Sequence, residues 1–79
     1  MIVITKMKDN TYSVSNGQEL VNDQSKPLAM ALCFWEYGIR RDMIDMAFDT
    51  MEKYRNDMIV FFNDTEYTTT KVDYSKVYK

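Results

Sequence analysis

Side chains that commonly carry catalysis are sparse in this 79-residue chain. It has no histidine, one cysteine (Cys33) and two glycines (Gly17 and Gly38). A nucleophilic site needs a base beside its Ser or Cys, and a phosphate-binding loop needs several glycines. The sequence contains neither arrangement, and its carboxylates do not follow the spacing of a calcium loop. We therefore predict that the chain is not an enzyme and has no catalytic residue, metal, cofactor or small-molecule substrate.

The lone cysteine lies inside an apolar run, residues 28–37, so we expect Cys33 to be a buried free thiol. One cysteine cannot form an intrachain disulfide, and a single free cysteine is typical of a protein from a reducing compartment. The first ten residues do not resemble a signal peptide, and no uncharged run reaches the about 20 residues that span a membrane. We expect a cytoplasmic protein with no membrane contact, located in the host cytoplasm if a phage encodes it.

Carboxylates are the one class of charged group that recurs regularly. Between residues 41 and 55 they occur three and four residues apart, which places them on one face of a helix. Such a stripe can steer or contact a basic partner, or it can be an ordinary solvated face. Arg41 could pair with the acid four residues later. The stripe consists of Asp42, Asp45, Asp49 and Glu52.

A pair of arginines, Arg40 and Arg41, follows Gly38 and gives this part of the chain the outline of a helix-turn-helix. Phe34 occupies a position that is normally small, and three carboxylates of the stripe would face DNA. The net charge of −2 also disfavours a polyanionic partner. The basic and aromatic end of the chain, residues 71–79, fits an edge strand with a solvated end better than a stacking platform. A nucleic-acid-binding regulator with a degenerate helix-turn-helix therefore stays an alternative.

The elements that would position these groups follow from periodicity and turn residues. Alternating β-favouring residues indicate strands at both ends of the chain. Asn16-Gly17 predicts a type I′ hairpin turn, and Ser25 with Pro27 predicts a helix start. Gly38 predicts the end of that helix. We expect one small α+β domain, residues 1–79: a β-meander at 1–22, helices at 25–37 and 41–55, a β-hairpin at 58–72 and a tail at 73–79.

Both predicted helices carry more apolar surface than one core requires. The first is apolar nearly all round, and the apolar arc of the second, which includes Met43, Met46 and Met51, exceeds half its circumference. Either the sheet curls round the helices and buries everything, or part of this surface is an interface. We favour an interface with a second copy or another protein. Its predicted residues are Met30, Phe34, Trp35, Tyr37, Ile44, Phe48 and Met51.

These observations favour a non-enzymatic protein-interaction module. Small size, absent catalytic groups and surplus apolar surface suggest a small inhibitor or adaptor of the kind that phages encode as viral accessory proteins, binding a host or partner protein. Two alternatives stay open at this stage. One is the nucleic-acid-binding regulator, and the other is a structural homo-oligomeric subunit.

Overall fold

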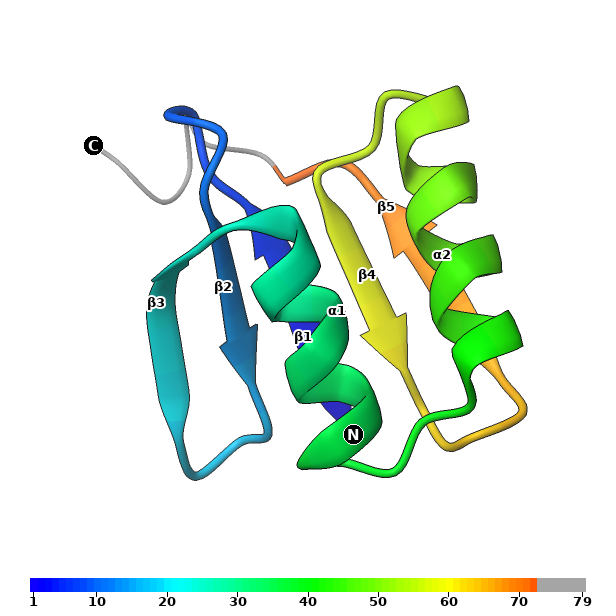
Figure 1. Ribbon diagram of the computed structural model, residues 1–79. Coiled ribbons are helices and arrows are strands. Elements are labelled where there is room, and N and C mark those ends of the chain that lie inside the picture. The colour runs from blue at the N-terminus through cyan, green and yellow to red at the C-terminus, as the bar shows by residue number, and fades with distance from the viewer. Residues whose placement is uncertain (73–79) are drawn as a thin grey trace.

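The α+β class is confirmed by a computed structural model, which describes residues 1–72 (Figure 1). The predicted tail, residues 73–79, lies outside the described residues. Five strands form one antiparallel sheet in the order β3-β2-β1-β4-β5. The elements are β1 (Ile2–Lys6), β2 (Tyr12–Ser15), β3 (Leu20–Gln24), α1 (Lys26–Trp35), α2 (Arg41–Lys53), β4 (Met58–Phe61) and β5 (Tyr67–Thr70).

The first strand joins the two ends of the chain into one sheet. β1 pairs with β2 on one side and with β4 on the other, so Ile4 lies opposite both Val14 and Ile59. These three side chains are completely buried. The N-terminal meander and the C-terminal hairpin are therefore two halves of one sheet, and β3 and β5 are its edges.

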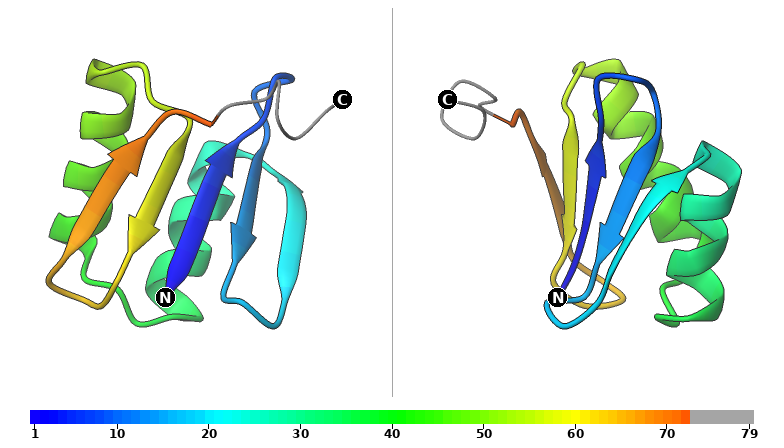
Figure 2. Two further views of the ribbon diagram at one scale, coloured as in Figure 1. Left: turned by 180° about the vertical axis from the view of Figure 1, so that it is seen from behind. Right: turned by 90° about the vertical axis from the view of Figure 1, so that its left-hand side faces the viewer.

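Both helices cover the same face of the sheet, and the opposite face has no helix on it (Figure 2). α1 buries only Ala29 and Cys33. α2 buries a broader stripe that packs with the sheet in a single hydrophobic cluster. The buried residues of α2 are Met43, Ile44, Ala47, Phe48 and Met51.

The helix signals in the sequence are confirmed. Ser25 is the N-cap of α1, and its Oγ accepts a hydrogen bond from the N–H of Leu28 at 3.4 Å. Gly38 has a left-handed φ of +66°, which lets the chain turn between the helices. The helices end at Trp35 and Lys53, slightly before the predicted ends at 37 and 55, because the last residues form turns rather than further helix.

The predicted type I′ turn at Asn16-Gly17 is wrong, although the hairpin is present. Only Gly17 has a positive φ, +92°, whereas a type I′ turn requires two such residues. Asn16 instead organises a longer loop, since its Oδ1 accepts hydrogen bonds from the N–H groups of Gln18, at 2.9 Å, and Glu19, at 2.7 Å. β3 consequently starts at Leu20, two residues later than a two-residue turn at Asn16-Gly17 would place it. No helix in the described part of the chain is long and apolar enough to cross a membrane.

Candidate functional site

The seven predicted interface residues separate into buried and exposed groups. Phe48 and Met51 are completely buried in the core, and Ile44 is a core residue with 2% of its surface exposed. These three predicted interface residues therefore do not form an exposed docking surface while the core is intact. Tyr37 lies beyond the end of α1 and packs against the core. The helical periodicity could not exclude them, because it does not say which part of an apolar arc faces the sheet.

The exposed group belongs to α1. Trp35 is 74% exposed and Phe34 is 36% exposed, while Met30 packs partly against the core. Leu28, 57% exposed, was not among the predicted interface residues. Its spacing from Trp35, seven residues or two helical turns, was the signal that could have identified it. The described sheet therefore does not curl round to bury all of the helical apolar surface.

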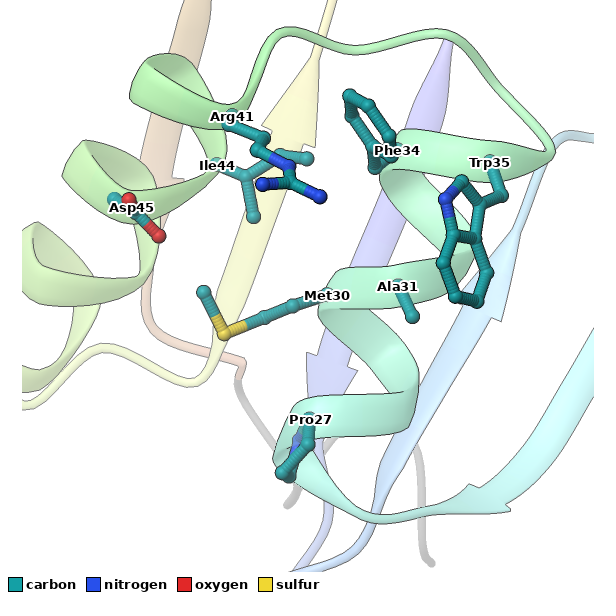
Figure 3. Close-up of a pocket in the computed structure, with 8 residues that line it drawn as sticks. All are labelled: Pro27, Met30, Ala31, Phe34, Trp35, Arg41, Ile44 and Asp45. Carbon is teal, nitrogen blue, oxygen red and sulfur yellow. The ribbon is translucent and has the colours of Figure 1, made fainter.

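A groove of about 340 Å³ separates the two helices (Figure 3). α1 supplies an apolar wall, and Ile44 of α2 lies in the groove with only 2% of its surface exposed. A smaller hollow of about 150 Å³ borders the other side of α1, next to β3, and Trp35 lines both. The groove residues are Pro27, Met30, Ala31, Phe34, Trp35, Arg41, Ile44 and Asp45.

The apolar side chains on the outer surface of α1 are contiguous. We call this surface the α1 face. It has no charged residue, because the last charge before it is Lys26 and the next is Glu36. Its residues are Pro27, Leu28, Met30, Ala31, Phe34 and Trp35.

Arg41 lies in the wall of the groove beside Phe34. Its guanidinium carbon lies 4.7 Å from the centre of the Phe34 ring, a distance at which a cation is attracted to an aromatic face. The other arginine, Arg40, forms a salt bridge of 2.8 Å with Asp42. Arg41 was expected to pair with Asp45, and among residues 1–72 that salt bridge does not occur.

All four carboxylates of the predicted stripe are exposed on α2, but their surroundings differ. Asp42 is paired with Arg40, and Glu52 is paired with Lys26 at the start of α1. Asp45 and Asp49 form no salt bridge with any described residue. Asp45 also lines the groove. The groove therefore has one carboxylate, Asp45, and one guanidinium, Arg41, in its lining, and Asp49 lies within electrostatic reach of Lys26.

Cys33 is a buried free thiol, as predicted. Burial raises its pKa to about 12, so the thiolate is scarce at neutral pH. Within the described residues, no three His, Cys, Asp or Glu side chains lie close enough together to hold a metal ion. Cys33 therefore acts as a small apolar core residue.

The uncovered face of the sheet is different in character from the α1 face. Side chains alternate along each strand, so the neighbours of the buried residues point away from the helices. Five of these eight are Ser or Thr, and none is charged. Ser13 is buried, and only Thr68 and Thr70 are exposed. The eight residues are Val3, Thr5, Ser13, Ser15, Met58, Val60, Thr68 and Thr70.

Comparisons with family models, curated proteins and solved structures found no match to this chain. The candidate site therefore depends on its own geometry: the α1 face, the groove beside it, and the carboxylates of α2.

Proposed function

We propose that this protein is a non-enzymatic interaction module that binds another protein through the α1 face. The observation that carries this proposal is the exposure of contiguous apolar residues on one helix. Exposed apolar residues scattered singly are ordinary on a soluble protein, whereas a contiguous patch marks an interaction site. Here Leu28, Phe34 and Trp35 surround two hollows on the same helix.

The composition of the α1 face resembles the centre of a protein interface. Interface centres are depleted in charge and enriched in aromatic residues, Met and Arg. The α1 face supplies Phe34, Trp35 and Met30, and Arg41 lies against the Phe34 ring. An exposed Trp beside a hollow is also the kind of residue that dominates binding energy.

A binding protein of this size affects its partner by occupying part of the partner's surface. We therefore propose the role of a small inhibitor or adaptor, of the kind that phages encode. The helix-turn-helix alternative has less support, because Arg40 and Arg41 both have intramolecular contacts and α2 presents its carboxylates to solvent.

The test is an affinity capture from nuclease-treated lysate of the source organism or its host, with two matched variants. Trp35→Ser removes the most exposed aromatic residue of the α1 face. Phe62→Ser, at an exposed site beyond β4, removes a comparable apolar group elsewhere. We expect a stoichiometric partner that is retained by the wild type and by Phe62→Ser and lost with Trp35→Ser.

Retention of the partner by both variants would overturn the proposal, because binding would then not depend on the α1 face. Recovery of only the protein's own untagged copies would favour the structural homo-oligomer. Far-UV circular dichroism of each variant verifies that it is folded.

A further inference from the structure

We propose that the α1–α2 groove also binds a second copy of this chain, so that self-association and partner binding compete for the α1 face. This inference rests on the proposed function and adds a form of regulation to the same site. It follows from two opposite charges in the lining of the groove, Arg41 and Asp45, whose arrangement is complementary to itself.

The two charges lie one helical turn apart on α2, on the side that faces α1 (Figure 3). Both residues are exposed, and neither forms a salt bridge with another residue of the range 1–72. A pairing of the two within one helix is weak, because a cation that precedes an anion is the less favourable order. Opposite charges on a bound protein can therefore reach both of them.

The contact of Arg41 with Phe34 prepares the guanidinium for a carboxylate. Its central carbon lies 4.7 Å from the centre of the ring. A guanidinium that stacks on an aromatic ring uses its flat face, while its N–H donors lie at its edge and stay available. The ring also limits the positions of this long side chain, so less conformational freedom is lost when a carboxylate binds.

A twofold axis that crosses α2 between Arg41 and Asp45 makes this surface complementary to its own copy. The two α2 helices then run antiparallel, and the same patch contributes from both copies. Arg41 of each copy lies opposite Asp45 of the other, which gives two ion pairs. The rest of the contact on α1 is apolar, because residues 27–35 have no charge. A different protein would need an acid and a base at the matching spacing, whereas a second copy has them by symmetry.

The size of the surface makes this dimer weak. α1 has 10 residues and α2 has 13, so at about 1.5 Å per residue they are about 15 Å and 20 Å long. With helices about 10 Å wide, each copy contributes about 350 Å² in projection. The total lies at the small end of specific interfaces, below about 1,200 Å². A partner with a larger contact therefore displaces the second copy, which until then shields Phe34 and Trp35 from water.

The test is an exchange of charges, read as the mass in sedimentation velocity at about 5–500 µM protein. We expect the wild type to change from monomer to dimer across this range. Arg41→Asp and Asp45→Arg each bring like charges together, so each variant alone should have a dimer dissociation constant at least about tenfold higher. An equimolar mixture of the two variants should form a 1:1 heterodimer, because each supplies the charge that the other lacks.

Two controls separate this pairing from general effects. The double variant Arg41→Asp/Asp45→Arg keeps one charge of each sign and should dimerise like the wild type. Asp64→Arg makes the same charge change in the β4–β5 loop and should leave the dimer unchanged. Far-UV circular dichroism verifies that every variant is folded.

A wild type that stays monomeric would overturn the inference, as would single variants that dimerise like the wild type or a mixture that stays monomeric. A partner complex whose mass contains two copies joined through the groove would contradict the competition. The proposed function is judged separately by the Trp35→Ser capture. A monomeric wild type that still captures a partner would refute only the dimer, and a dimer without any captured partner would refute only the proposed function.

Discussion

The two methionines Met46 and Met51 of α2 allow a direct test of how this helix is oriented. Both lie on the broad apolar side expected from the sequence, yet Met51 is completely buried and Met46 is 50% exposed. Replacing each by alanine removes the same atoms from the same helix. The two substitutions therefore differ mainly in burial.

The expected cost follows from that difference. Met51→Ala loses a fully buried side chain and leaves a cavity, so it should lower the free energy of unfolding by about 3 kcal/mol. Full burial of a Met side chain contributes about 2 kcal/mol, and half-exposed Met46 has only about half of that to lose. Met46→Ala also creates no cavity, and alanine is a slightly better helix former than methionine. Its cost should be below about 1 kcal/mol. A domain of this length has a total stability of about 4–12 kcal/mol.

Urea denaturation followed by far-UV circular dichroism measures both values. With a denaturant slope of about 1 kcal/mol per molar urea, the midpoint should fall by about 3 M for Met51→Ala and by less than about 1 M for Met46→Ala. If Met51→Ala does not fold, Met51→Leu should still cost measurably more than Met46→Leu. Equal losses for the two alanine variants would refute the orientation of α2, and with it the assignment of core and surface.

Two further predictions concern the thiol and the connection between the helices. Because burial raises the pKa of Cys33 to about 12, a thiol reagent at pH 8 should modify it only at the rate at which the protein opens, and fast modification in native buffer would contradict its burial. Gly38→Ala should lower the free energy of unfolding by about 1–2 kcal/mol, because φ is +66° there. A Cβ at Gly38 would meet no atom within 4 Å, so the cost is conformational, and an unchanged urea midpoint would show that the chain relaxes out of this conformation.

Local signals predicted much of the fold correctly. The element order, the cap at Ser25, the left-handed Gly38 and the buried Cys33 all depend on residues near one another in the chain. The hairpin loop at Asn16 was predicted with the wrong turn type. The Asn16 side chain accepts two backbone hydrogen bonds from the loop, and the Asn-Gly pair alone does not indicate this.

The candidate site was only partly predictable. Phe34 and Trp35 were expected at a surface and are exposed. Ile44, Phe48 and Met51 were assigned to the same surface and lie in the core. The acidic stripe was recognised, while the pairing of Glu52 with Lys26 joins residues from different helices and has no local signal.

The types and order of the elements could be predicted from the sequence, because turn residues, caps and hydrophobic periodicity act over a few neighbouring residues. Which part of each apolar arc is buried depends on the packing of the whole chain. The outcome depends on β1 pairing with β4, which are separated by most of the chain, and on both helices then packing on one face of the sheet. The groove between α1 and α2, and the position of Asp45 beside it, exist only as a result of that packing.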